Sequence, residues 1–491
     1  MTTIDTAPTP PCAILGPERR LALVDALRAC VGASHVLIHG DTPDAELAGF
    51  ERDWRKRWQG RALAVVKPGC TPELVAVVKL AREFGVSLVP QGGNTGLVLG
   101  GVPDTSGQQL LLSLARMNRV RALDASNLTI TVEAGCILQH VQQAADEAGL
   151  FFALSLAAEG SCTIGGNLAT NAGGTQVLRY GNARALCLGL EVVTPAGEVW
   201  DGLAGLRKDN TGYDLRDLYI GSEGTLGIIT AATLVLHPRP AARLTAMASC
   251  TTLDDAVALL KLAQSRGGAA LTGFEVMGAH ALALVRKHYP ALQQPLPPAA
   301  WTVLLELSDA EGEAHAQAVL EGLLESALDR GLIGDAAVAT SIAQSRTMWH
   351  LRESIPLAQA DEGLNIKHDI ALPVSAIAEF VRVTDAALQT RWPGAQSVNF
   401  GHLGDGNLHY NLQAPAGSDT ANFLREHEAA VNTLVYDSVT RFGGSISAEH
   451  GVGQLKRDEL AHYKSPVALA LMRSIKQALD PHGLMNPGRV V

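Results

Sequence analysis

Two histidines with a turn between them are the residues of this chain best suited to metal chemistry. His402 and His409 lie seven positions apart and enclose Gly404-Asp405-Gly406. Side chains alternate between faces along a strand, so this odd spacing within one strand would point the two rings apart. Glycine tolerates positive φ and aspartate favours tight turns, so His402 can end one strand while His409 begins the next. The two rings can then converge.

A carboxylate and a third imidazole follow at Glu449-His450. Two histidines and a glutamate are a common open ligand set for a catalytic divalent metal, which makes His402, His409 and Glu449 candidate ligands. The simpler interpretation is that these are ordinary solvated or hydrogen-bonded histidines, since the chain contains 15 of them. Motifs elsewhere in the chain favour the metal.

A glycine-rich loop directly after a strand is the second informative stretch. Periodicity and capping residues predict a strand at 62–66, a helix capped by Thr71 and ended by Gly85, and a strand at 86–89. That strand runs into Pro90-Gln91-Gly92-Gly93-Asn94-Thr95-Gly96. Backbone N–H groups of such a loop can bind a dinucleotide pyrophosphate. The loop is neither Gly-x-Gly-x-x-Gly nor a Walker A sequence, so a plain glycine-rich turn is the alternative.

A second run of small and polar residues covers 160–174, and its composition suits close approach to a flat cofactor. Pro238-Arg239-Pro240 then indicates a boundary. Beyond it, strands alternate with helices, which predicts an antiparallel sheet with helices on one face. The expected strands are 245–249, 271–276 and 302–306, and the expected helices are 253–263, 279–288, 313–327, 346–360, 422–440 and 467–479.

The composition is that of an ordinary globular protein of 491 residues, with 47% hydrophobic and 18% charged residues. The net charge of −10 and the lack of a Lys/Arg run argue against nucleic acid and anionic membranes as partners. The seven cysteines are scattered, which argues against a disulfide framework. The first residues lack a leader pattern, and no apolar run reaches the ~20 residues of a bilayer span, so a cytoplasmic protein is expected.

Taken together, these stretches resemble the FAD-linked D-2-hydroxy-acid dehydrogenases of the vanillyl-alcohol-oxidase superfamily. The resemblance covers roughly residues 55–491. It rests on motifs in the family's order: Pro90–Gly96, Gly160–Gly174, Arg207–Asp214, Gly221–Ile229, Gly401–Asn411, Ser447–Gly453 and Asn486-Pro487. It implies an α+β fold with a two-subdomain FAD-binding domain, an α+β cap domain and a C-terminal tail that returns to the flavin. The expected division is a helical lead-in at 1–54, the FAD-binding domain at 55–238, the cap domain at 239–450 and the tail at 451–491.

The resemblance also implies FAD held without a covalent bond, because the loop at 90–96 contains no histidine. That loop would lie at the pyrophosphate. The remaining implied FAD-binding residues are Ser161, Gly165, Gly166, Asn167, Thr170, Asn171, Gly224, Gly227, Ile229 and Asn486.

In the branch that oxidises D-2-hydroxyglutarate, the implied metal ligands fall on His402, His409 and Glu449, with Zn²⁺ the expected ion. The implied catalytic and substrate-binding residues fall on Arg352, Lys367, Asn411 and His450. Without the resemblance, Arg352 is a surface helix charge and Lys367 an exposed strand residue. One position departs from the family pattern: Pro356 stands where that branch has a threonine that contacts substrate, which puts the distal group of the substrate in doubt.

The expected reaction is oxidation of a D-2-hydroxy acid to the 2-oxo acid by hydride transfer to flavin N5. His450 is the expected base, and the metal would polarise the 2-hydroxyl. D-Lactate or glycolate is the alternative substrate. A metal-dependent hydrolase without flavin and a non-catalytic flavin subunit are the remaining alternatives. The expected partners are a small anionic substrate, an electron acceptor (electron-transfer flavoprotein, quinone or cytochrome) and, in a homodimer, a second copy.

Overall fold

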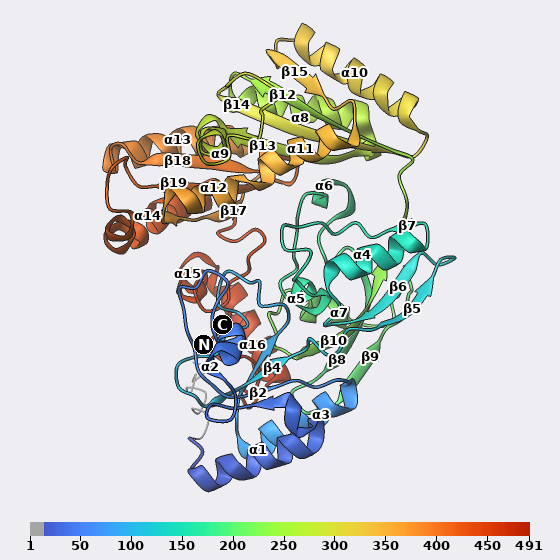
Figure 1. The fold of residues 1–491 in the computed structure, drawn as a ribbon, viewed down its shortest axis with the longest axis vertical. Coiled ribbons are helices and arrows are strands. Elements are labelled where there is room, and N and C mark those ends of the chain that lie inside the picture. Colours follow the sequence, from blue (N-terminus) through green and yellow to red (C-terminus); the bar gives the residue numbers. More distant parts are fainter. Residues whose placement is uncertain (1–13) are drawn as a thin grey trace.

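The computed structural model describes residues 14–491. The missing leader pattern and the first part of the expected helical lead-in at 1–54 fall on residues 1–13, outside the described part. Figure 1 shows a large sheet with its helices in the upper part and two smaller sheets in the lower part. The division at residues 54, 238 and 450 stays a prediction.

The first sheet has the strand order β1-β2-β4-β3, in which β1 is antiparallel to β2 and the other pairs are parallel. Its strands are β1 (Val36–Leu37), β2 (Ala62–Val66), β3 (Leu88–Gln91) and β4 (Gln109–Ser113). Helices α1 (Pro17–Val31) and α3 (Thr71–Phe84) pack their apolar faces on it through Leu27 and Val78. Helix α3 starts at Thr71 itself, with Cys70 at the N-cap position, and ends at Gly85 in the left-handed region. A short helix, α2 (Asp44–Glu51), precedes β2.

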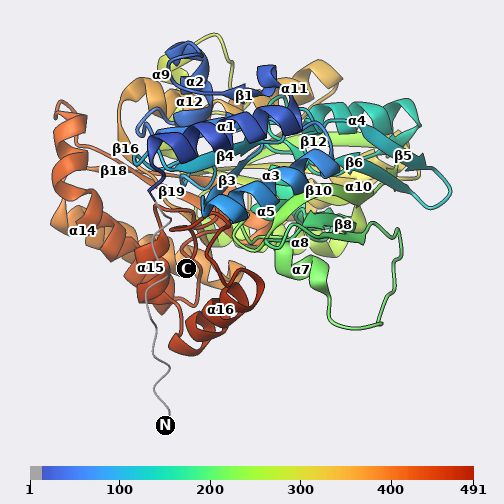
Figure 2. The ribbon, with the colours of Figure 1, turned by 90° about the horizontal axis from the view of Figure 1, so that it is seen from below.

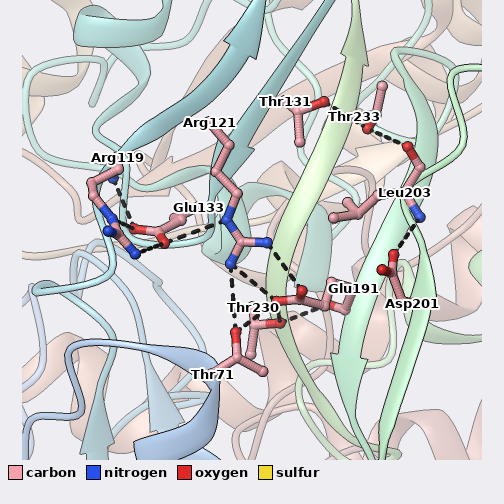
Figure 3. A network of polar contacts seen from close by, with 10 residues as sticks. All are labelled: Thr71, Arg119, Arg121, Thr131, Glu133, Glu191, Asp201, Leu203, Thr230 and Thr233. Carbon is pink, nitrogen blue, oxygen red and sulfur yellow. Dashed lines mark hydrogen bonds and ion pairs between the residues drawn. The ribbon is translucent and has the colours of Figure 1, made fainter.

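The second sheet is antiparallel, with the order β5-β6-β10-β8-β9. Its strands are β5 (Val120–Asp124), β6 (Thr129–Glu133), β8 (Cys187–Val193), β9 (Val199–Gly202) and β10 (Ile228–Val235). A polar network fastens it to the first sheet's helix, because Arg121 and Thr71 both hydrogen-bond to the Glu191 carboxylate, at 3.0 Å and 2.7 Å (Figure 3). Burial opposes the charge of Glu191, but these bonds outweigh it and lower the pKa of that carboxyl.

Short helices and a small strand pair lie on the connections of the second sheet. They are α4 (Leu138–Glu147), α5 (Ile164–Ala169), α6 (Val177–Tyr180), α7 (Leu215–Tyr219), β7 (Leu150–Phe151) and β11 (His237–Pro238). The loop before α7, which contains the Arg207–Asp214 motif, extends away from the body in Figure 2.

The third sheet is antiparallel, with the order β15-β12-β14-β13-β18-β19-β16, and β17 also pairs with β19. Its strands are β12 (Ala242–Cys250), β13 (Leu271–Gly278), β14 (Trp301–Asp309), β15 (Asp335–Val338), β16 (Asn365–Ile366), β17 (Asp369–Ala371), β18 (Gln396–His402) and β19 (Asn407–Gln413). The expectation of helices on one face is wrong. Ala246 and Ala248 join the core under α8 (Leu253–Gly267), α10 (Glu313–Asp329) and α13 (Ile377–Arg391), whereas Met247 joins the core under the helices of the opposite face.

The helices of that opposite face are α9 (Ala279–His288), α11 (Ile342–Glu353) and α12 (Ile355–Glu362). The expected single helix over 346–360 is therefore broken at Ser354, which ends α11 and begins α12. Pro356 explains the break, because proline has no N–H to continue the helical hydrogen bonds and is tolerated in a first turn. Pro356 lies in the first turn of α12.

The C-terminal region crosses from the cap to the first sheet through α14 (Thr420–Arg441), α15 (Arg457–Tyr463) and α16 (Pro466–Leu479). In Figure 1, α15 and α16 lie in the lower part of the molecule, beside the blue N-terminal elements. The tail then joins strand β3: the Leu88 N–H donates to Leu484 O at 2.9 Å, and the Asn486 N–H donates to Leu88 O at 2.8 Å. The expected return of the tail to the FAD-binding half is confirmed.

Candidate active site

The turn between the two histidines brings their rings together. Strand β18 ends at His402, a single 3-10 turn covers Leu403–Asp405, and Gly406 has φ 86° before β19 begins. The ring centroids of His402 and His409 are 5.7 Å apart. The structure thus has the two-strand geometry that the spacing predicted.

Glu449 completes a compact cluster with these rings. Potential ligand atoms of His402, His409 and Glu449 lie within 4.8 Å of one another, and His402 Nε2 is 3.7 Å from Glu449 Oε1. Burial and three neighbouring carboxylates raise the pKa of Glu449 to about 7, although His402 opposes this. Burial alone would lower the pKa of His402, yet Glu275 and Glu449 raise it to about 9. A cluster with this excess of carboxylates attracts a cation, so its donor set fits a divalent metal.

Glu275, on β13, orients the first of these candidate ligands, His402. Its Oε1 lies 2.6 Å from His402 Nδ1, and its Oε2 accepts from Arg352 Nε at 2.8 Å. With Nδ1 held by the carboxylate, Nε2 is the nitrogen that faces Glu449. A carboxylate on the outer nitrogen of a ligating imidazole fixes the tautomer and raises its basicity. Sequence reasoning missed Glu275.

Asp369, on β17, fixes the other side of the cluster and was also missed. Its Oδ2 accepts the backbone N–H groups of Glu449 and His450, each at 2.9 Å. Its Oδ1 accepts from Asn407 Nδ2 at 2.9 Å and lies 3.9 Å from His409 Nδ1. One buried carboxylate therefore positions the loop that carries Glu449 against the strand that carries His409. Asp369, His409 and His450 also form a second group of possible ligand atoms within 4.8 Å of one another.

His450 stands between this cluster and the large cavity of the molecule. Its ring lies parallel to that of His409, with centroids 6.2 Å apart, and its Nδ1 is 3.5 Å from Asp369 Oδ2. Burial lowers its pKa to about 4; Asp369 partly offsets this, and Lys456 and Arg55 add to it. The imidazole is thus neutral near pH 7 and can accept a proton.

The cavity has a volume of about 1030 Å³, counted to its open mouth, and His450 forms part of its wall. The two glycine-rich stretches form most of the rest. A Cβ atom on Gly92 would lie 2.3 Å from Thr163 Oγ1, and one on Gly93 would lie 2.0 Å from Ser161 O, so glycine is required for the two stretches to touch. The predicted FAD-binding residues that line the cavity are Pro90, Gln91, Gly92, Gly93, Asn94, Thr95, Gly96, Gly165, Gly166, Asn167, Thr170, Gly224, Gly227 and Ile229.

Three predicted FAD-binding residues are not in this wall. Ser161 donates to Ala158 O at 3.4 Å, and Asn171 accepts from the backbone N–H of Arg184 at 3.0 Å. Asn486 donates to Gly100 O and Glu223 O, at 2.9 Å and 2.8 Å, so it fastens the tail to the wall. Thr163 was missed: it lines the cavity, and its buried Oγ1 has no hydrogen-bond partner within residues 14–491. An unpaired buried hydroxyl there fits a hydrogen-bonding cofactor.

Comparison with known proteins assigns the cavity to FAD. Residues 62–202 match the FAD binding domain, and residues 239–490 match the C-terminal domain of FAD linked oxidases. D-2-hydroxyglutarate dehydrogenase of Xanthomonas citri pv. viticola is 40% identical over 450 residues, which are 91% of this chain and 93% of that protein. The mitochondrial enzyme of that name in Bos taurus is 38% identical over 451 residues, 92% of this chain and 80% of that protein. The chain belongs to the FAD-linked D-2-hydroxy-acid dehydrogenases.

This dehydrogenase also has the fold of solved flavoproteins. The structure of p-cresol methylhydroxylase has a TM-score of 0.75 at 17% identity, covering 97% of each chain. That likeness confirms the vanillyl-alcohol-oxidase fold, and the FAD-binding domain excludes the alternative of a flavin-free hydrolase. A mitochondrial relative in Schizosaccharomyces pombe, 34% identical over 95% of this chain and 90% of that protein, bears a provisional D-lactate dehydrogenase name. Within the described part of the dehydrogenase, no helix is long and apolar enough to cross a membrane.

The predicted substrate-binding residues of the dehydrogenase differ in how they are held. Arg352 is buried, donates through Nε to Glu275 and stacks its guanidinium 4.8 Å from the centre of the Phe400 ring. It is therefore not a surface charge. The Asn411 amide is tied into the sheet, accepting from the His368 N–H at 3.1 Å and donating to Gln359 Oε1 at 2.9 Å. Lys367 remains exposed on the connection between β16 and β17.

Glu223 joins the FAD cavity to the loop that carries Glu449 and His450. Its side chain is buried and accepts the backbone N–H groups of Val452 and Gly453, each at 2.7 Å. Its backbone has a φ of 52°, a conformation that non-glycine residues seldom adopt. Burial raises the pKa of Glu223 above its ordinary value. Its carboxyl therefore fixes the loop of Glu449 and His450 against the wall of the cavity.

Replacing Glu275 by glutamine should weaken metal binding about 10- to 100-fold, the usual effect of losing a partner of a ligating histidine. Glutamine cannot accept hydrogen bonds from both His402 and Arg352 while its amide group faces one of them. Competition with a coloured chelator would measure the affinity, and the FAD content should stay unchanged. Glu325→Gln, at an exposed position of α10, is the matched control. Equal metal affinity in both variants would contradict the role of Glu275.

Proposed function

We propose that this dehydrogenase oxidises D-2-hydroxyglutarate to the 2-oxo acid. The observation that carries the proposal is the position of His450, which lines the FAD cavity and stacks beside His409 of the metal cluster. The two cofactor sites therefore share one wall. A substrate held at that wall can present its hydroxyl proton to a base and its C2 hydrogen to a flavin together. Relatives named D-2-hydroxyglutarate dehydrogenase, at 38% and 40% identity, support this substrate.

His402, His409 and Glu449 are the residues that would hold the metal, with Zn²⁺ expected. A divalent metal there supplies a Lewis acid that lowers the pKa of a bound hydroxyl. FAD in the cavity supplies a hydride acceptor at N5.

The side chains of the protein perform the remaining tasks. His450 accepts the hydroxyl proton at an imidazole nitrogen, because burial keeps the ring neutral. Arg352 directs its terminal nitrogens to the substrate carboxylate, since Glu275 occupies only its Nε. Lys367 adds positive charge, and Asn411, held rigidly by Gln359, limits where the substrate can lie.

D-Lactate is the second candidate substrate. The provisional name of the Schizosaccharomyces pombe relative favours it, as does Pro356, which has neither a hydroxyl nor an N–H for a distal carboxylate. The electron acceptor, a homodimeric state and a cytoplasmic location stay predictions.

An anaerobic panel of D-2-hydroxy acids tests the proposal. The oxidised protein should absorb near ~450 nm as flavoproteins do, and D-2-hydroxyglutarate should bleach that band. The L-enantiomer should not, and prior treatment with a chelator should slow the bleaching. A flavin that stays oxidised with every D-2-hydroxy acid would refute the proposal.

A further inference from the structure

The four-residue helix α6 belongs to the hydrophobic cores of both halves of the molecule. In Figure 1 it lies between the large sheet above and the smaller sheets below. Its Leu178 packs against the core of the cap, and its Tyr180 packs against the core of the FAD-binding half. Arg179, between them, donates from Nη1 to Ser308 O on β14 at 2.8 Å. The helix is therefore fixed to both halves within a single turn.

The chain that leads into α6 comes from the wall of the FAD cavity. Asn167 and Thr170 line the cavity. The N–H of Ala172 donates to Asn167 O at 2.8 Å, which closes a turn directly before Gly173. Residues 173–180, the bridging segment, therefore continue the cavity wall toward the cap.

The bridging segment contacts the turn between the two histidines. A Cβ atom on Gly404, the middle residue of the Leu403–Asp405 turn, would lie 2.8 Å from Leu178 Cδ2. Cβ atoms do not approach other atoms that closely, so the leucine side chain packs directly on the backbone of the turn. The turn connects His402, the last residue of β18, to β19. Leu178 therefore supports the connection that sets how far apart the rings of His402 and His409 lie.

The bridging segment also contacts the third candidate ligand. A Cβ atom on Gly173 would lie 2.7 Å from Glu449 Oε1, so the carboxylate rests on bare backbone. The φ angles of Gly173 and Gly404 are outside the left-handed region, so an added methyl group at either position would disturb the contact and not the backbone conformation. The bridging segment thus touches the metal cluster on two sides.

We infer that Leu178 is a positioning residue of the metal site. The inference rests on the proposed function, which places a divalent metal at His402, His409 and Glu449. A ligand set binds its ion tightly only when surrounding residues hold the donor atoms in place. Here a leucine of the FAD-binding half holds the turn of the cap, so docking of the two halves completes the metal site. The same contact fixes the metal relative to the flavin, as hydride transfer requires.

Leu178→Ala is the test, measured as the affinity of the purified holoenzyme for Zn²⁺ in competition with a coloured chelator. The void should release the turn and weaken Zn²⁺ binding about 10- to 100-fold, the effect of removing a group that orients a ligand. The FAD content should stay unchanged, because Leu178 is not part of the cavity wall. Leu178→Met keeps the side-chain volume and should bind Zn²⁺ within about twofold of the wild type.

Leu244→Ala is the matched control. Leu244 packs against the same core from β12, and β14 and β13 lie between that strand and β18. This variant should lose thermal stability much as Leu178→Ala does, yet keep its Zn²⁺ affinity. Unchanged Zn²⁺ affinity in Leu178→Ala, or an equal loss in Leu244→Ala, would overturn the inference.

Gly404→Ala approaches the same contact from the other side. Its methyl group should meet Leu178, displace the turn and weaken Zn²⁺ binding. Adding Leu178→Ala should restore part of the affinity, because the smaller side chain makes room for the methyl group. Wild-type affinity in Gly404→Ala would overturn the inference even if Leu178→Ala did not fold.

The Zn²⁺ titration separates this inference from the proposed function. A wild-type protein that binds no Zn²⁺ would overturn the inference together with the metal site. If Zn²⁺ binds but no D-2-hydroxy acid reduces the flavin, the proposed function fails, and the Zn²⁺ affinities of the variants still decide the role of Leu178. If the flavin is reduced and Leu178→Ala binds Zn²⁺ as tightly as the wild type, only the inference fails.

Discussion

His409→Ala should lower turnover at least about 10³-fold, because a Lewis-acidic metal contributes several kcal/mol and each ~1.4 kcal/mol is a factor of ten. The imidazole of His409 is one of three groups whose donor atoms converge within 4.8 Å. Burial holds its pKa well below the ordinary value, so the ring is neutral and ready to ligate. The measurement is metal content per chain together with kcat under anaerobic conditions.

The FAD content of this variant should remain normal, since His409 is not part of the cavity wall. His140→Ala, at an exposed position of α4, is the matched control and should keep both metal and turnover. A His409→Ala protein with wild-type kcat would show that the cluster is not a catalytic metal site.

His450→Asn should slow flavin reduction about 10²- to 10⁴-fold, the usual contribution of a positioned general base. Asparagine keeps a polar side chain near Asp369 but cannot take up a proton. Stopped-flow absorbance should show the slower reductive phase, while substrate affinity and metal content change little. The backbone N–H of residue 450 still donates to Asp369, so the loop should keep its place.

A wild-type reduction rate in His450→Asn would remove this residue as the base. Loss of the metal from the same variant would instead favour the second ligand group, in which His450 joins Asp369 and His409. The two results are distinguishable because one changes a rate and the other a metal content.

The sequence predicted the strands and helices that a clear apolar pattern or capping residues mark. The buried strand Ala62–Val66 and the helix Ala279–His288 have the expected bounds. Strand β5 was missed because all five of its residues are exposed, so no apolar alternation marks it. The helices on both faces of the large sheet were missed because its central strands β13 and β14 are buried along nearly their whole length, which removes the alternation that identifies a single core.

The residues of the candidate site also fall into two groups: those that a local pattern reveals and those that only tertiary packing brings together. The converging rings of His402 and His409 follow from a short turn, which a sequence can reveal. Glu275 contacts His402 across 127 positions, and Glu223 contacts Gly453 across 230. No spacing rule connects such pairs, since only the packed sheets bring them together. Lys367 and Asp369 are two positions apart in the sequence, but that spacing could not show that Asp369 holds the loop of Glu449 and His450.

The hydrogen bonds between Leu88 and the tail have a consequence for how the protein is made. Leu88 belongs to an early strand, and its partners Leu484 and Asn486 leave the ribosome hundreds of residues later. The wall of the cavity that includes Gly100 is likewise fastened by Asn486. Domains usually fold as they emerge, N-terminal part first. Here one edge of the first sheet, strand β3, stays unpaired until the cap and then the tail have been synthesised. The order of synthesis therefore makes the FAD site the last part of the molecule to be closed.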